Sequence, residues 1–148
     1  MQIESMLTES LTLAKAPDAS KKRVLETLAN LLSKHMGLDD AGEVFHQFIS
    51  REKLGSTGIG QGIAIPHCRF GSGDKTLCAY LTLSEPIDFD SVDNEPVDVV
   101  VAMLVPENAE NDHLETLAVL AESLQKSDYV SRLRNAKNSH ELYKVAIS

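Results

Sequence analysis

Three stretches of the chain repeat apolar residues every three or four positions, which is the spacing of one buried helix face. They predict amphipathic helices at about residues 20–36, 41–53 and 113–126, and two shorter helices are expected near Asp128 and Ser139. The side chains of the three long helices expected to face inward are Val24, Leu25, Leu28, Leu31, Leu32, Val44, Phe45, Phe48, Ile49, Leu114, Leu117, Leu120, Ala121 and Leu124.

Four other stretches are rich in apolar and β-branched residues and predict strands. They cover about Leu11–Lys15, Gly62–Ile65, Thr76–Leu83 and Val97–Val105, and the last is almost continuously apolar, as expected of a central strand. Strands interleaved with helices of these lengths predict an α/β fold, a sandwich in which helices cover both faces of one sheet. The order of the strands does not follow from this pattern.

The size of the chain, 148 residues of which 43% are hydrophobic, suits one core. A chain of this length buries roughly 68–70% of its unfolded surface, so we expect one domain over residues 1–148. No stretch approaches the roughly 20 consecutive apolar residues of a membrane helix. The N-terminus also lacks the pattern of a signal peptide. We therefore expect a cytoplasmic protein without membrane insertion.

The formal net charge of −8 argues against nucleic acid as a partner, because an acidic protein repels a phosphate backbone. Lys21, Lys22 and Arg23 form an isolated basic cluster that suits a solvated helix start. A basic protein is a better match than nucleic acid as a partner for this acidic chain. The two cysteines, Cys68 and Cys78, are too few and too close in sequence for a disulfide framework.

The candidate chemistry concentrates in a glycine-rich run, Gly55–Arg69, which reads Gly-Ser-Thr-Gly-Ile-Gly-Gln-Gly-Ile-Ala-Ile-Pro-His-Cys-Arg. Pro66 fixes its own backbone and biases Ile65 toward an extended conformation, so we expect His67 to be held rigidly at a strand end. The glycines allow backbone N–H groups to turn toward an anion. The run does not complete G-x-G-x-x-G and precedes a strand, which argues against a dinucleotide site or a P-loop.

His67 is the candidate phosphate-accepting residue. A neutral imidazole is a good nucleophile near neutral pH, and a phosphoryl group on it stays reactive enough to move on. On position alone, a partly buried structural histidine is the alternative.

A metal site with Cys68 and Cys78 would lack the C-x-x-C or H-E-x-x-H spacing, and no G-x-S-x-G elbow supports a hydrolase. We expect no metal and no other cofactor.

The segment Arg51–His67 resembles the active-site segment of type-2 enzyme IIA domains, the fructose and mannitol class of the bacterial phosphoenolpyruvate-dependent phosphotransferase system. Similar segments at Asp93–Pro106, His113–Leu117 and Ser139–Tyr143 extend the resemblance over nearly the whole chain. Within this family the sequence is most similar to the nitrogen-regulatory branch. The resemblance implies a single mixed sheet flanked by helices.

The resemblance also implies the roles of five residues. His67 would be phosphorylated by a small histidine phosphocarrier, with His113 donating to the phosphoryl oxygens and Arg51 neutralising charge. Ser56 and Thr57 would add hydroxyl or backbone donors. A transfer from histidine to histidine needs no metal.

Cys68 departs from the family, which usually has glycine directly after the active histidine. If its backbone has positive φ, Cys68 would store strain of order 1–3 kcal/mol. A thiol beside a cationic pocket would also become oxidisable, so we expect peroxide to lower phosphoryl acceptance.

The leading hypothesis is a phosphocarrier whose phosphorylation state decides which proteins it binds. For the nitrogen branch the implied targets include potassium-transport and kinase proteins, with a histidine phosphocarrier of the nitrogen type as donor. One alternative is a sugar-specific IIA for fructose or mannitol that passes phosphate to a separate IIB. The other is a docking or sensor domain that never turns over.

Overall fold

The computed structural model describes residues 3–71, 75–109 and 112–148, with the side chains of Asp112 and His113 outside the described part. The elements in chain order are η1 (Ile3–Ser5), η2 (Glu9–Leu11), β1 (Thr12–Ala16), α1 (Lys21–His35), α2 (Gly42–Lys53), β2 (Gly58–Gly60), β3 (Ile63–Ala64), β4 (His67–Arg69), β5 (Leu77–Ile87), β6 (Val97–Val105), α3 (Asp112–Ser123), α4 (Ser127–Asn135) and α5 (Ser139–Ala146).

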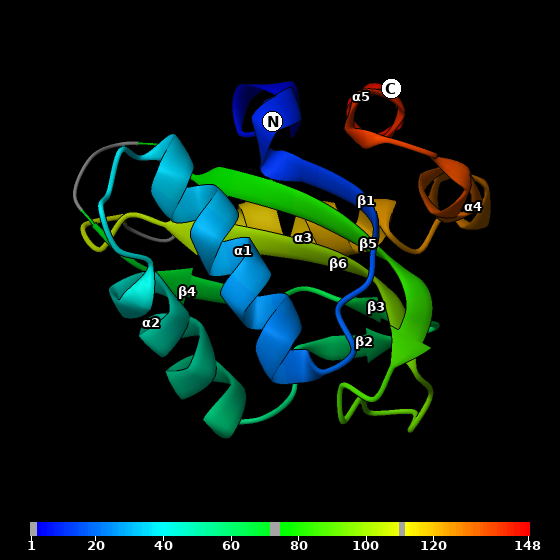
Figure 1. The fold of residues 1–148 in the computed structure, drawn as a ribbon, viewed down its shortest axis with the longest axis horizontal. Coiled ribbons are helices and arrows are strands. Elements are labelled where there is room, and N and C mark those ends of the chain that lie inside the picture. Colours follow the sequence, from blue (N-terminus) through cyan, green and yellow to red (C-terminus); the bar gives the residue numbers. More distant parts are fainter. Residues whose placement is uncertain (1–2, 72–74, 110–111) are drawn as a thin grey trace.

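The strands form one mixed sheet with the order β1-β5-β6-β3-β2, in which β4 also pairs with β6. β1 runs parallel to β5, and β3 and β4 run parallel to β6, whereas the β5–β6 and β2–β3 pairs are antiparallel. α1 and α2 cover the front face of the sheet in Figure 1, and α3 lies behind it. This arrangement confirms the predicted α/β sandwich with helices on both faces.

The inward faces of the first two helices follow the predicted pattern closely. Ser20 caps α1 by accepting a hydrogen bond from the Arg23 backbone N–H at 3.1 Å. Leu31, Phe45 and Ile49 were expected inside but are only half-buried. The fully buried side chains of α1 and α2 include Val24, Leu25, Leu28, Leu32, Val44 and Phe48.

The prediction for the third long helix was wrong at its start. Leu114 is 58% exposed and Leu117 is half-buried, whereas Leu120 and Leu124 are completely buried. Leu117 still packs against the buried core, so among the described inward candidates of this helix it is Leu114 that lies largely in solvent. The helix also ends at Ser123, before the expected Lys126.

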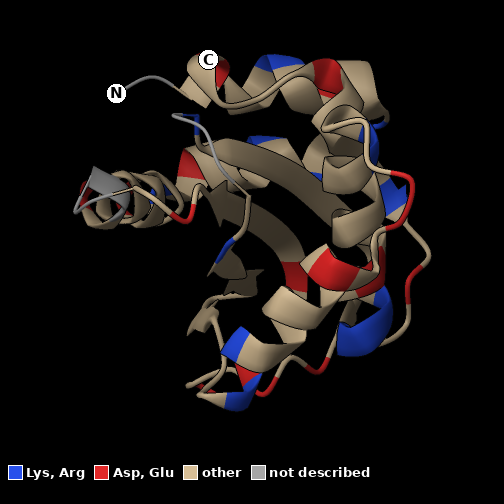
Figure 2. Cartoon of the chain, turned by 90° about the vertical axis from the view of Figure 1, so that its left-hand side faces the viewer, with Lys and Arg blue, Asp and Glu red and all other residues tan. Residues whose placement is uncertain are grey.

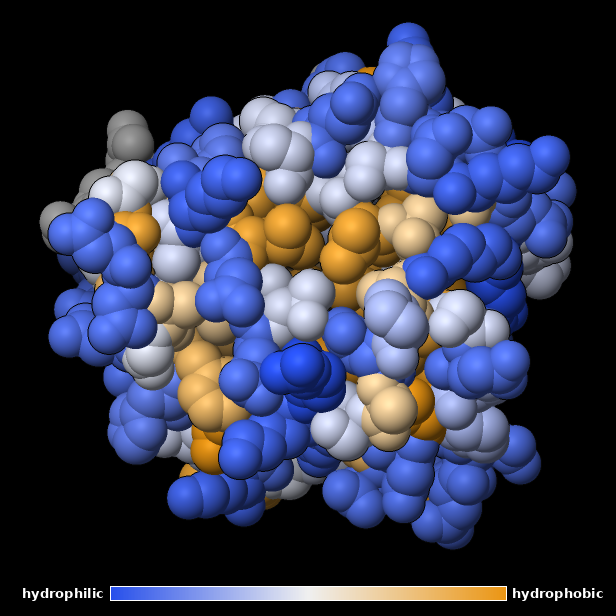
Figure 3. Space-filling view, viewed as in Figure 1, coloured by the Kyte–Doolittle hydropathy of each residue, from blue (hydrophilic) through white to orange (hydrophobic). Residues whose placement is uncertain are grey.

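Charged residues lie on helices and loops and are rare on the central strands, as the side view in Figure 2 shows. β6 is buried at eight of its nine positions and β5 is buried along its first seven. The face that carries α1 and α2 is mostly hydrophilic, with apolar side chains visible only in patches (Figure 3). Among the described helices, none has both the length and the apolar composition needed to cross a bilayer.

The segment around His67 forms one interrupted line of strand along β6. Ile63 pairs with Val99 in β3, and His67 pairs with Met103 in β4, so the register continues unchanged across the interruption. Pro66 lies in the gap, and its carbonyl accepts the Met103 N–H at 2.8 Å. His67 is thus the first residue of a strand, whereas the pattern predicted that it follows a strand end.

β2 and β4 were not predicted, and the expected strand at residues 62–65 is reduced to two residues. Both missed strands are three residues long, too short for alternation to be recognised, and β2 reads Gly-Ile-Gly. β5 extends to Ile87, beyond the expected end at Leu83. The remaining boundaries lie within a few residues of the predicted ones.

Candidate functional site

A cavity of about 360 Å³ opens between the end of α2, β4 and the end of β6. It contains both His67 and Arg51, which are 16 positions apart in the sequence and were predicted to act together. α2 supplies one wall and β4 the opposite one. The residues that line the cavity are Gln47, Ser50, Arg51, Leu54, His67, Cys68, Arg69 and Val105.

The ring of His67 is half-buried and oriented by the backbone just before it. Its Nδ1 lies 2.8 Å from the carbonyl oxygen of Ile65. A carbonyl oxygen can only accept, so Nδ1 carries the hydrogen in this bond. In the neutral ring the lone pair is then on Nε2, which makes Nε2 the nucleophilic nitrogen.

Arg51 lies in the last turn of α2, where its Nη1 donates to the carbonyl oxygen of Gly55 at 2.9 Å. This bond satisfies a carbonyl just beyond the helix end. Gly55 has φ +148°, so the chain turns there in a conformation that other residues rarely adopt. A guanidinium has five N–H donors, so Arg51 retains donors for an anion while holding this turn.

The structure uses the side chains of Ser56 and Thr57 to build the loop, and neither lines the cavity. Ser56 Oγ donates to the Phe89 carbonyl at 2.7 Å and accepts the Gly58 N–H at 3.0 Å. Thr57 is 4% exposed, and its hydroxyl and backbone N–H both donate to the Glu52 carboxylate. Phosphate binding by these two residues stays a prediction.

His113 is the second residue of α3, and its side chain lies outside the described part of the structure. Its predicted role beside His67 therefore stays a prediction. Among the described side chains, no group of three or more His, Cys, Asp or Glu gathers in a way that could hold a metal ion.

The condition set for strain at Cys68 is not met. Cys68 lies within β4 and is not among the residues with positive φ, so its backbone stores no such strain. Burial raises the pKa of the Cys68 thiol from 9.0 to about 12, opposite to the lowered pKa of a reactive thiol. A raised pKa argues against the expected peroxide sensitivity, which stays a prediction. Cys78 is also a free thiol, and burial raises its pKa to about 12.

Arg69 lines the cavity but was not singled out from the sequence. It lies two positions after His67 in β4, which places both side chains on the same side of the strand. Its Nη1 donates to the Ala109 carbonyl at 2.8 Å. The i, i+2 spacing would have indicated this residue if β4 had been recognised as a strand.

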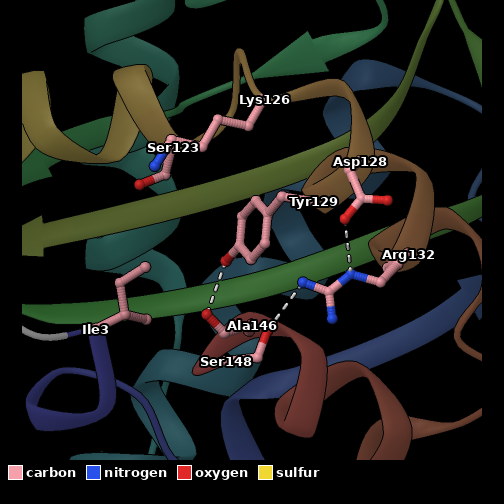
Figure 4. Close-up of a pocket in the computed structure, with 8 residues that line it drawn as sticks. All are labelled: Ile3, Ser123, Lys126, Asp128, Tyr129, Arg132, Ala146 and Ser148. Carbon is pink, nitrogen blue, oxygen red and sulfur yellow. Dashed lines mark hydrogen bonds and ion pairs between the residues drawn. The ribbon is translucent and has the colours of Figure 1, made fainter.

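A second cavity of about 260 Å³ lies between α4 and the C-terminal end of the chain, and contains none of the predicted site residues. Figure 4 shows the Tyr129 hydroxyl donating to the Ala146 carbonyl at 2.7 Å. Arg132 contacts the carboxylate of Asp128 and the hydroxyl of Ser148. The bonds to Ala146 and Ser148 join α4 to the end of the chain, whereas the contact with Asp128 lies within α4.

A mixed sheet flanked by helices, with the cavity that His67 and Arg51 share, suggests a particular class of protein. Comparison of the sequence with known families identifies that class. Residues 5–147 match the family described as "Phosphoenolpyruvate-dependent sugar phosphotransferase system, EIIA 2". The chain belongs to this family, whose members are phosphotransfer components.

Within the family the chain is similar to nitrogen-regulatory members. It is 44% identical to the nitrogen regulatory protein of Pseudomonas aeruginosa over 147 residues, which cover 99% of this chain and 96% of that protein. The crystal structure of nitrogen regulatory protein IIA-Ntr from Neisseria meningitidis has a TM-score of 0.86 and 35% identity, and the match covers 95% of this chain and 96% of that one.

A more distant match shows the fold alone. The mannitol enzyme IIA of Escherichia coli, solved as a complex with phosphorylated enzyme IIB, has a TM-score of 0.74 and 19% identity. The match covers 95% of this chain and 96% of that one.

Proposed function

We propose that this chain is a regulatory phosphocarrier of the nitrogen type, which accepts a phosphoryl group on Nε2 of His67 from a histidine phosphocarrier. The observation that carries the proposal is the bond from His67 Nδ1 to the Ile65 carbonyl, inside a cavity shared with Arg51. That bond leaves Nε2 as the lone-pair nitrogen of a ring that is already oriented. Its family and its nitrogen-regulatory relatives support the same function.

In the transfer, the lone pair on His67 Nε2 forms a bond to phosphorus. The bond from phosphorus to the donor histidine nitrogen breaks, and its electron pair returns to the donor ring. Positive charge develops on the His67 ring, and the Ile65 carbonyl oxygen that accepts the Nδ1 hydrogen stabilises it. The phosphoryl group carries about −1.5 to −2 charge, part of which the Arg51 guanidinium neutralises.

The proposal includes three further residues and the biological setting. His113 would donate to the phosphoryl oxygens from the start of α3, and Ser56 and Thr57 would act through the backbone of the loop that they hold. The family match over residues 5–147 supports one EIIA domain over residues 1–148. A cytoplasmic location and the lack of a cofactor are further parts of the proposal. Protein targets, such as potassium-transport or kinase proteins, would distinguish the two phosphorylation states by the added negative charge.

Incubation with phosphoenolpyruvate, enzyme I and a histidine phosphocarrier tests the proposal by mass spectrometry. We expect an acid-labile phosphoryl adduct on the unmodified chain, none on His67→Ala, and an undiminished adduct on His35→Ala, an exposed histidine on α1. An equal adduct on His67→Ala, or none on the unmodified chain, overturns it. Rapid onward transfer to the cysteine of a IIB protein would instead favour the sugar-specific alternative.

A further inference from the structure

Glu52 is a buried carboxylate close to the cavity but not part of its lining. Its side chain is 5% exposed, and Oε2 lies 2.6 Å from Nζ of Lys21. Its Oε1 accepts the Thr57 backbone N–H at 3.0 Å and also the Thr57 hydroxyl. A carboxylate is costly to bury unless it is paired, and here both oxygens have partners on other segments.

The contacts of Thr57 continue to the imidazole of His67. The Thr57 carbonyl accepts the Ile65 N–H at 2.9 Å, and the Ile65 carbonyl accepts from Nδ1 of His67 at 2.8 Å. Glu52 thus holds Thr57, Thr57 holds the backbone of Ile65, and Ile65 holds the ring of His67. The position of the carbonyl that orients the ring therefore depends on Thr57, and the position of Thr57 depends on Glu52.

The segment between α2 and β3 needs such an anchor because it is rich in glycine. Residues 54–62 contain four glycines, each of which has more backbone freedom than any other residue type. Thr57 is the buried position within this segment whose side chain and backbone N–H both reach Glu52. Loss of that carboxylate would leave both donors of Thr57 without this acceptor.

Glu52 is itself tied to elements that do not belong to the loop. Lys21 is the first residue of α1, and Figure 1 shows the start of α1 and the end of α2 at the same end of the molecule. The Lys21 ammonium also lies 3.5 Å from the Asp90 carboxylate and 5.0 Å from the centre of the Phe89 ring. The ion pair thus fixes Glu52 against two other segments.

We propose that Glu52 is a positioning residue for His67. Through Thr57 and Ile65 it fixes the carbonyl that receives the Nδ1 hydrogen, and so it sets the tautomer in which Nε2 holds the lone pair. The effect on phosphoryl transfer rests on the proposed function, whereas the effect on the tautomer does not.

The tautomer is measured directly by ¹⁵N NMR of the His67 ring in protein labelled at histidine. We expect the Nδ1–H tautomer in the unmodified chain and a mixture of both tautomers in Glu52→Ala. Glu52→Gln keeps an acceptor oxygen for Thr57 and should retain the original tautomer. The matched control is Glu141→Ala, since Glu141 also accepts a backbone N–H, from Lys137 at 2.8 Å, but lies on α5 outside this series of contacts.

The rate of phosphoryl transfer gives a second readout. A displaced nucleophile lowers transfer rates by up to about 100-fold, so we expect Glu52→Ala to lower kcat about 10- to 100-fold. The KM for the phosphocarrier should not change, because Glu52 is buried and does not contact a partner. Glu52→Gln should restore most of the rate.

An unchanged tautomer in Glu52→Ala overturns the positioning role, whatever the transfer rate. If Glu52→Ala does not fold, Glu52→Asp takes its place, because it keeps the charge but shortens the reach to Thr57. If the His67 ring then has the same tautomer in Glu52→Asp as in Glu141→Asp, the positioning role is overturned. A change of tautomer in Glu52→Asp alone supports the role. If the unmodified chain does not accept phosphate, the proposed function is rejected. The tautomer measured by NMR still tests the positioning role, because it does not depend on phosphoryl transfer.

Discussion

The Nδ1 of His67 donates to the carbonyl oxygen of Ile65 across Pro66, so the ring is fixed by the backbone two residues earlier. Phosphorylation on Nε2 preserves this bond, whereas phosphorylation on Nδ1 would break it. We therefore predict that all of the adduct is the Nε2 phosphohistidine. Two-dimensional NMR of the phosphorylated ring, labelled with ¹⁵N, distinguishes the two isomers, and an Nδ1 adduct would contradict the prediction.

Arg51 should raise the rate of phosphoryl transfer through the planar arrangement of its N–H donors as well as through its charge. Removing one preorganised donor from a developing anion typically costs about 10²- to 10³-fold in rate, so we expect that loss of phosphoryl transfer for Arg51→Ala. Arg51→Lys keeps the charge but loses the planar fork and should recover only part of the rate. Initial rates with the phosphocarrier check this, and Arg132→Ala, on α4 at the second cavity, is the control. Full activity of Arg51→Ala would reject a role in transfer.

Gly58 has no room for a side chain, because an added Cβ would fall on the Oγ of Ser91. Overpacking of this kind costs about 1–3 kcal/mol, so we expect Gly58→Ala to lower the free energy of unfolding by that amount in urea titrations. Because β2 pairs with β3 next to the site, phosphoryl acceptance should also fall.

Two further variants make the Gly58 prediction specific. The double variant Gly58→Ala with Ser91→Gly should recover most of the stability, because it removes Oγ and Cβ of Ser91, the two atoms that the new methyl group approaches most closely. Gly42→Ala, at the start of α2, is the matched glycine change away from the sheet. If Gly58→Ala lowers the free energy of unfolding equally with and without Ser91→Gly, the contact with the Ser91 side chain is not the cause.

The thiols of Cys68 and Cys78 should be unreactive in the folded protein. With a pKa of about 12, only about one thiol in 10⁴ is ionised at pH 8. We expect slow alkylation by iodoacetamide at pH 8 and fast alkylation in urea. Rapid modification of Cys68 in the folded state, or loss of phosphoryl acceptance in peroxide that Cys68→Gly prevents, would contradict this prediction.

The same pKa shift predicts how stability depends on pH. The pKa of each thiol is higher in the folded protein than the 9.0 of an ordinary thiol, so ionisation favours the unfolded chain. The contribution of each thiol is complete below about pH 9 and is lost as the pH rises toward 12. Urea titrations of Cys68→Ala across this range should show a weaker loss of stability at alkaline pH than the unmodified chain.

Periodicity was enough to predict the long elements, because their inward residues repeat over many positions. α1, α2 and β6 lie close to their expected bounds. Leu114 shows the limit of this reasoning: its spacing is helical and the helix forms, but its side chain is exposed, because whether a helix face is covered depends on what packs against it. The short strands β2 and β4 could not be predicted because pairing with neighbours, and not their own residues, makes them strands.

For the site, the sequence by itself determined the candidate residue: the run from Gly55 through Pro66 singled out one imidazole, because proline restricts the backbone and glycine frees it in any fold. Only the tertiary structure decided how that imidazole is used. The cavity shared by Arg51 and His67, the Ile65 carbonyl on Nδ1, and Thr57 bound to Glu52 all arise from contacts between segments. Such contacts depend on the packing of α2 against α1 and β4, which no local pattern of residues encodes.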